Sequence, residues 1–204
     1  MKLMIKVIVF DMNGVVVTNF SQEVWEKHAK KLKLSVDELK KIFKEYVAWD
    51  NVTKKATAER FWLHRKNDWK NIELKDLKSL LKDLHASEKV NPEMIELIKN
   101  LRGKYKIGVL SNVSGVLPDL LKNKYQIPEL VDYSLSSADF GIAKPDSKVF
   151  SKMLTKLKLK PEELIFIDDK LHNVEAAKQI GIKAMHFVEM KQLKKGLRDQ
   201  KVLG

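Results

Sequence analysis

Short apolar runs rich in β-branched residues recur along this chain, and helical stretches separate them. Each run predicts a buried strand of a parallel sheet, since both faces of such a strand are covered and its sequence need not alternate between apolar and polar residues. Alternating strands and helices predict an α/β fold, a doubly wound parallel sheet of the Rossmann-like kind. The clearest runs are Ile5–Phe10, Lys106–Leu110, Leu164–Ile167 and Lys183–Val188, and Tyr133–Ser136 is a weaker one.

The segment from residue 18 to residue 87 contains no strand-like run and predicts several helices. Ser35–Glu38 has the pattern of a capping box, and an apolar helical face follows it from Leu39 to Val47. All four tryptophans lie in this segment, and we expect them to pack in its core. The sequence therefore predicts a core domain of residues 1–17 and 88–204, and an inserted all-helical cap domain of residues 18–87 over the carboxyl edge of the sheet.

The charge of the chain narrows the classes of partner. The formal net charge is +12, but only four of the 39 basic residues are arginine. Arginine reads phosphates and base edges better than lysine does, so no specific nucleic-acid partner is expected, although the charge favours anionic substrates. The absence of cysteine excludes thiolate chemistry. No apolar run is long enough for a membrane span, so we expect a cytoplasmic protein without a membrane partner, and its oligomeric state is left open.

Polar residues with catalytic potential stand directly after the predicted strands. Asp11, Ser111–Asn112 and Asp168–Asp169 each follow a strand, and Lys144 lies in a loop between two of them. Residues beyond the carboxyl ends of parallel strands line the ligand crevice of a doubly wound sheet. Carboxylate oxygens suit Mg²⁺, and a lysine and a metal offset the charge that keeps a carboxylate from attacking a phosphoryl group. Aspartate is an established nucleophile in such transfers.

These positions resemble the four motifs of the haloacid dehalogenase (HAD) superfamily. Phe10–Val15 is similar to the first motif, Val109–Asn112 to the second, Ile142–Pro145 to the third, and Phe166–Asp169 with Asn173 to the fourth. The long interval between the first two motifs is typical of members with an inserted cap. The later part of the chain resembles the phosphatase branch that carries a small helical cap, which includes sugar-phosphate phosphatases.

The resemblance implies a magnesium site. It makes Asp11 both the nucleophile and a metal ligand, and it makes the backbone carbonyl of Asn13 a second ligand. Asp169 is expected to bind Mg²⁺ directly, and Asp168 is expected to act through the water shell of the ion.

The resemblance also implies a phosphate site and a reaction. Ser111 and the backbone of Asn112 are expected to hold phosphate oxygens, Lys144 to neutralise nucleophile and phosphate, and Asn173 to brace the loop. The implied activity is hydrolysis of a small phosphorylated metabolite, a phosphomonoester, through an aspartyl-phosphate intermediate with Mg²⁺ as cofactor.

The chain departs from the phosphatase pattern at Asn13, where the family has a second aspartate. That aspartate protonates the leaving oxygen and then deprotonates the attacking water, and an amide can do neither. Four explanations stay open: a substitution introduced to trap an intermediate, a natural substitution in an enzyme with good leaving groups or another base, loss of turnover, or partial deamidation of Asn13-Gly14 to aspartate. His172, beside the acidic pair, is one candidate for a substitute base.

Other functions are compatible with the same motifs. The alternative from a different class is a catalytically silent protein that binds a phosphate ligand or nucleic acid with the old site and its basic surface. A dehalogenase is disfavoured by the intact pair Asp168–Asp169, which indicates magnesium and phosphate. A carbon–phosphorus hydrolase would need a cap lysine that forms a Schiff base, and the cap has many lysines.

Overall fold

The computed structural model describes residues 4–53, 57–69, 72–113 and 117–204. Its centre is a five-stranded parallel sheet with strand order β3-β2-β1-β4-β5. The prediction of an α/β fold with a doubly wound parallel sheet is confirmed. The strands, in chain order, are β1 (Val7–Phe10), β2 (Lys106–Ser111), β3 (Tyr133–Ser136), β4 (Leu164–Asp168) and β5 (Lys183–His186).

Strand β1 is the middle of the sheet and explains its continuous apolar sequence. All four of its residues are buried, and β2 and β4 pair with it on either side. Each of the five predicted runs contains a strand, although β1 begins two residues after Ile5 and β5 ends two residues before Val188. Strand ends shift in this way because apolar pattern alone does not show where the ladder of hydrogen bonds stops.

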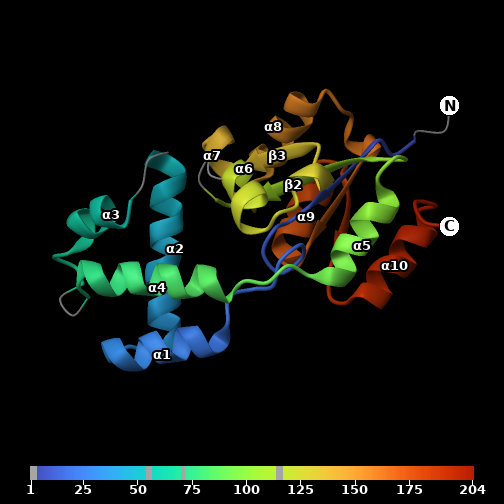
Figure 1. The fold of residues 1–204 in the computed structure, drawn as a ribbon. Coiled ribbons are helices and arrows are strands. Elements are labelled where there is room, and N and C mark those ends of the chain that lie inside the picture. The colour runs from blue at the N-terminus through green and yellow to red at the C-terminus, as the bar shows by residue number, and fades with distance from the viewer. Residues whose placement is uncertain (1–3, 54–56, 70–71, 114–116) are drawn as a thin grey trace.

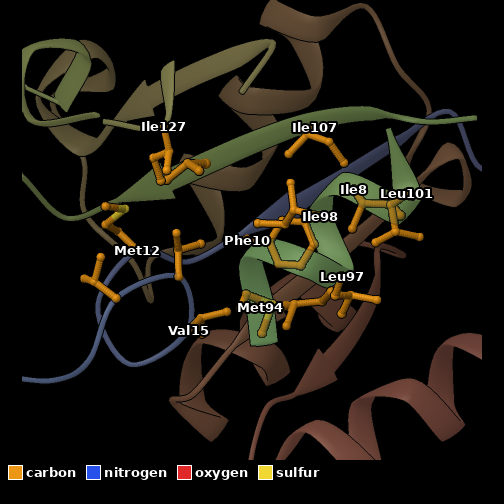
Figure 2. Packing of buried hydrophobic residues seen from close by; sticks show 14 of the residues in the cluster. Ile8, Phe10, Met12, Val15, Met94, Leu97, Ile98, Leu101, Ile107 and Ile127 are labelled. Carbon is orange, nitrogen blue, oxygen red and sulfur yellow. The ribbon is translucent and has the colours of Figure 1, made fainter. Parts of the chain in front are cut away.

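Helices cover both faces of the sheet. On one face Ile8 and Phe10 of β1 pack against Met94 and Ile98, as Figure 2 shows. These belong to α5 (Pro92–Leu101), and α10 (Met190–Asp199) covers the same face. The opposite face packs on α8 (Ser147–Leu157) and α9 (Leu171–Gln179). Burying an aliphatic or aromatic side chain contributes roughly 1.5–3 kcal/mol, so these two layers supply most of the stabilisation of the sheet.

The short elements between these helices are single turns. They are α6 (Leu117–Asp119), the π-helical turn η1 (Leu120–Lys124), η2 (Pro128–Leu130), α7 (Ser137–Phe140) and η3 (Pro161–Glu163). The last of them directly precedes β4. Asn91 caps α5, because its side chain accepts a hydrogen bond from the amide of Met94 at 3.2 Å.

A group of helices is inserted between β1 and α5 and stands to one side of the sheet (Figure 1). It consists of α1 (Gln22–Leu32), α2 (Val36–Thr53), α3 (Ala58–Arg65) and α4 (Leu74–Ser87). Ser35 and Glu38 form the expected capping box at the start of α2. Trp25, Leu39 and Leu84 are buried where α1, α2 and α4 meet. The helical insertion is therefore confirmed, and the division of the chain into domains at residues 18 and 87 stays a prediction.

Two chain segments connect the inserted helices to the sheet, and they pair with each other. The amide of Thr18 donates to the carbonyl of Lys89 at 2.8 Å, and the amide of Asn91 donates to the carbonyl of Val16 at 2.9 Å. This pairing holds the inserted helices beside the carboxyl ends of the strands. No helix of the described residues is both long and apolar enough to cross a membrane.

Candidate active site

Three carboxylates meet at the carboxyl edge of the sheet. Asp11 follows β1, Asp168 is the last residue of β4, and Asp169 comes next. Each offers one oxygen, and these three oxygens lie within 4.8 Å of one another. The pairing of β1 with β4 causes this approach, because Phe10 and Ile167 are partners in the register and the following residues leave the sheet together.

Lys144 reaches this cluster from the loop after α7. Its Nζ donates to Asp11 Oδ1 at 2.7 Å, to Asp168 Oδ2 at 2.8 Å and to the carbonyl of Leu110 at 3.0 Å. The three donors of the ammonium group are therefore all used. Asn112 clamps the backbone of Lys144, since its side chain exchanges two hydrogen bonds of 2.9 Å with the amide and carbonyl of that residue.

Burial and charge act in opposite directions on this group of side chains. Burial raises the pKa of Asp11 to about 6, against the pull of the Lys144 ammonium and with the help of the Asp168 charge. Burial also works against the charged form of Lys144, but Asp11 and Asp168 together outweigh it and raise the pKa of the lysine. Lys144 therefore stays positively charged between two carboxylates, where it offsets negative charge at the edge of the sheet.

Asp168 and Asp169 differ in how far their oxygens are engaged. Asp168 is fully buried. It accepts hydrogen bonds from Lys144 and from the backbone amide of Lys170, and Asn173 Nδ2 donates to both of its carboxylate oxygens. Asp169 Oδ2 accepts from Lys170 and, at 3.2 Å, from Asn19, whereas its Oδ1 is buried and has no hydrogen-bond partner among the described residues. An acceptor oxygen of this kind is suited to a cation.

Gly14 leaves room for the carboxylate of Asp169. Its φ is +86°, and a Cβ built on it would stand 2.4 Å from Asp169 Oδ2. Any larger residue would displace Asp169, so a glycine at this position lets the loop after β1 approach the acidic cluster. The unpartnered oxygen, the three hard oxygen donors and this close approach fit a bound Mg²⁺, which would be held by Asp11 and Asp169.

Two of the predicted phosphate-binding residues, Ser111 and Asn112, line a cavity of about 620 Å³, and Lys144 is not among its described lining residues. Ser111 ends β2 and is 3% exposed, and Asn13 and Asn112 lie on the same wall. The structure thus brings the predicted residues to one edge of the sheet.

The clamp between Asn112 and Lys144 was not predicted, since nothing in the sequence pairs a residue after β2 with a loop 32 positions later. None of the described residues lining the cavity is a tryptophan.

The sequence did not indicate Glu88 as a site residue. Its side chain contacts Asn13, the residue at which the chain departs from the phosphatase pattern. The side chain of Asn13 donates to Glu88 Oε1, while Glu88 Oε2 accepts from Tyr125 at 2.9 Å and pairs with Lys124. The Glu88 side chain is 2% exposed. Burial opposes its charged form, but the hydrogen bonds from His85 and Lys124 outweigh burial and lower its pKa. No strand end precedes Glu88, so the rule that found the other residues could not find this one.

Two further predicted residues keep the places expected of them. Asn173 is buried and braces the loop by donating to Asp168. His172 is exposed on α9, and its part as a substitute base stays a prediction.

Solved structures share this fold over nearly the whole chain. A HAD-like hydrolase of Porphyromonas gingivalis has a TM-score of 0.74 at 22% identity, and covers 98% of this chain and 100% of that one. A HAD family enzyme of Bacteroides thetaiotaomicron, solved with magnesium and inorganic phosphate, has a TM-score of 0.70 at 19% identity, and covers 93% of this chain and 98% of the other.

Curated relatives match a smaller part. A sesquiterpene phosphatase of Aspergillus oryzae is 30% identical over 99 residues, which is 47% of this chain and 50% of that protein. The chain thus spans half of that relative. A family model described as haloacid dehalogenase-like hydrolase matches residues 5–181, which include β1 to α9 and all four motifs. The resemblance seen in the motifs is confirmed, and the chain belongs to the haloacid dehalogenase-like hydrolases.

Proposed function

We propose that the chain is a magnesium-dependent phosphomonoester hydrolase that uses Asp11 as its nucleophile. The observation that carries the proposal is the contact of Lys144 with both Asp11 and Asp168 at the carboxyl edge of the sheet. A buried lysine between two carboxylates lowers the negative charge that an incoming phosphate dianion would meet. The phosphatase among the curated relatives and the phosphate-bound enzyme among the solved structures support the same substrate chemistry.

Each residue of the site has a separate proposed role. Asp11, Asp169 and the carbonyl of Asn13 would hold Mg²⁺, which supplies charge that polarises the phosphoryl group. Asp168 stays fully hydrogen-bonded and fixes Lys144. Ser111 and the backbone of Asn112 would bind phosphate oxygens at the wall of the cavity.

The reaction then has two halves. A carboxylate oxygen of Asp11 attacks phosphorus, the bond from phosphorus to the leaving oxygen breaks, and the leaving oxygen takes a proton from solvent water. Water next attacks the phosphorus of the aspartyl phosphate, gives a proton to solvent, and releases Asp11 and inorganic phosphate. Asn13 can neither supply the first proton nor accept the second. Both halves are therefore expected to be slow with an alkyl phosphate, since general acid–base help contributes about 10²–10⁴ in rate.

Acetyl phosphate tests this proposal, because its leaving group needs little protonation. Freshly made protein mixed with acetyl phosphate and Mg²⁺ should accumulate the aspartyl phosphate, since the second half lacks its base. Mass spectrometry should find one added phosphoryl group on the peptide that contains Asp11, and Asp11→Asn should lose it. Aged samples serve as a control, because deamidation of Asn13 would release the label.

A second candidate function follows from the same amide. The side-chain amide of Asn13 is held by its hydrogen bond to Glu88, and this amide has no proton to exchange in catalysis. A protein that binds phosphate ligands without turnover would keep all the other contacts of the site. Binding of Mg²⁺ and phosphate by fresh protein without any adduct from acetyl phosphate would favour this function over hydrolysis.

A further inference from the structure

We propose that the substrate of this site is a phosphomonoester whose organic part is uncharged and apolar, and that Phe20, Phe43 and Val47 bind that part. The inference rests on the proposed function for the phosphate end of the ligand. It adds a substrate class, which follows from the walls of the cavity.

The cavity extends from the phosphate-binding wall to the inserted helices. Ser111 and Asn112 lie at the sheet edge, whereas Phe43 and Val47 come from α2 and Phe20 from the segment that leads into α1. Its volume of about 620 Å³ lies within the range of small-molecule sites, about 300–1,000 Å³. A ligand with its phosphate beside Asp11 therefore has room for an organic group against α2.

The walls facing that organic group are mainly apolar. Phe20 and Phe43 meet edge to face with ring centroids 5.3 Å apart, and both are half-buried. Half-buried Leu120 of η1 adds aliphatic surface to the lining of the cavity. Val47 is half-buried and lies outside the apolar core of the inserted helices. Covering such partly exposed apolar atoms with a ligand removes them from water and favours an apolar group.

The charges near the walls argue against a second anionic group on the ligand. Lys124 and His85 are the basic side chains among the described lining residues, and both contact Glu88. The same carboxylate accepts hydrogen bonds from Asn13 and Tyr125. A bisphosphate would need to break this buried pair, and separating one partner from a buried ion pair is strongly unfavourable. The cavity therefore favours an uncharged organic group over a sugar bisphosphate or a nucleotide.

Binding of alkylphosphonates tests the inference without turnover. Methyl-, butyl- and octylphosphonate present the same anionic head and differ only in apolar length. In calorimetry with the Mg²⁺-loaded protein, the affinity should rise about fourfold for each buried methylene, as expected from the transfer of apolar groups out of water. An octyl chain that ends in a carboxylate should bind at least tenfold more weakly than octylphosphonate.

Two neighbouring variants of α2 give a matched control. Val47→Asn places a polar group in the cavity, and it should lower the preference for octylphosphonate over methylphosphonate about tenfold. Ala48→Asn makes the same kind of change at an exposed residue that is not among the described lining residues, and it should leave that preference unchanged. Equal effects of the two variants would overturn the assignment of Val47.

The outcomes separate this inference from the proposed function. Methylphosphonate binding with no dependence on chain length would overturn the inference and leave the phosphate site intact. Tight binding of long alkylphosphonates and equally tight binding of uncharged octanol would support the apolar cavity and contradict the phosphate site. Preference for a bisphosphate over octylphosphonate would overturn the inference.

Discussion

Replacing Asn13 by aspartate tests how far one amide limits this enzyme. The family pattern alone predicts that Asn13→Asp raises phosphatase turnover by at least about tenfold and by up to about 10²–10⁴, because it restores a proton donor and a base. The structure modifies this expectation. The Asn13 side chain donates a hydrogen bond to buried Glu88, and a carboxylate in its place would lose that bond and meet a second negative charge.

The repulsion between Glu88 and a carboxylate at position 13 can be calculated from their separation. Two unit charges about 4 Å apart repel by about 4 kcal/mol at an effective dielectric constant of 20, which corresponds to about a thousandfold change in an equilibrium constant. The pairing of Glu88 with Lys124 reduces this repulsion but does not remove the carboxylate. We therefore expect Asn13→Asp alone to gain about tenfold, and Asn13→Asp with Glu88→Gln to gain the full 10²–10⁴.

The assay is hydrolysis of p-nitrophenyl phosphate and of an alkyl phosphate, with and without Mg²⁺, on freshly prepared proteins. Glu88→Gln alone provides no acid at position 13 and should show no gain, so it is the matched control. The alkyl phosphate should respond more than the aryl phosphate, because its alkoxide needs protonation to leave. Equal turnover of the double variant and the parent protein would refute the reasoning, and would mean that another group already performs the proton transfers.

Three further predictions concern the metal, the loop after β1 and the surface. Asp169→Asn should lose Mg²⁺ binding in calorimetry with little change in the melting temperature. Asp168→Asn should instead cost about 3 kcal/mol of stability, because Lys144 loses one of its buried charged partners. The reverse pattern would contradict the two roles. Gly14→Ala should weaken Mg²⁺ binding at least tenfold by displacing Asp169, while Gly103→Ala, at a similar φ of +88° with nothing near its Cβ, should affect only stability, by about 1–2 kcal/mol. DNA or RNA binding should be weak and should disappear near physiological salt, and a sequence-selective complex that survives would speak against a merely solvated lysine surface.

The sheet and the acidic cluster could be predicted because one rule produces both. Apolar runs identify parallel strands, and the residues after such strands must meet at one edge of the sheet. From the sequence alone, that rule predicted that Asp11 and Asp169 lie close together, as they do in the structure. Lys144 was predicted from its motif, but its three hydrogen bonds depend on a loop conformation that no local pattern shows.

Glu88 shows why the rest could not be predicted. It lies just after α4, in the segment that leads back from the inserted helices, and a polar residue there is ordinarily exposed to solvent. Its burial arises from the approach of two distant parts of the chain, one carrying Asn13 and the other carrying Lys124 and Tyr125, to the same carboxylate. Tertiary convergence of this kind has no period or spacing in the sequence, so only the structure reveals it.

The charges at the sheet edge support the proposal that Mg²⁺ and a phosphate bind at this site together. Asp11, Asp168 and Asp169 carry three negative charges when ionised. Among the described residues, Lys144 contacts Asp11 and Asp168, and Lys170 pairs with Asp169. Burial and the charge of Asp168 raise the pKa of Asp11, against the pull of the Lys144 ammonium group. A phosphate dianion would be repelled from this edge, whereas a divalent cation at the unpartnered oxygen of Asp169 would balance the charge and allow the dianion to approach. We therefore predict that Mg²⁺ would bind before the substrate.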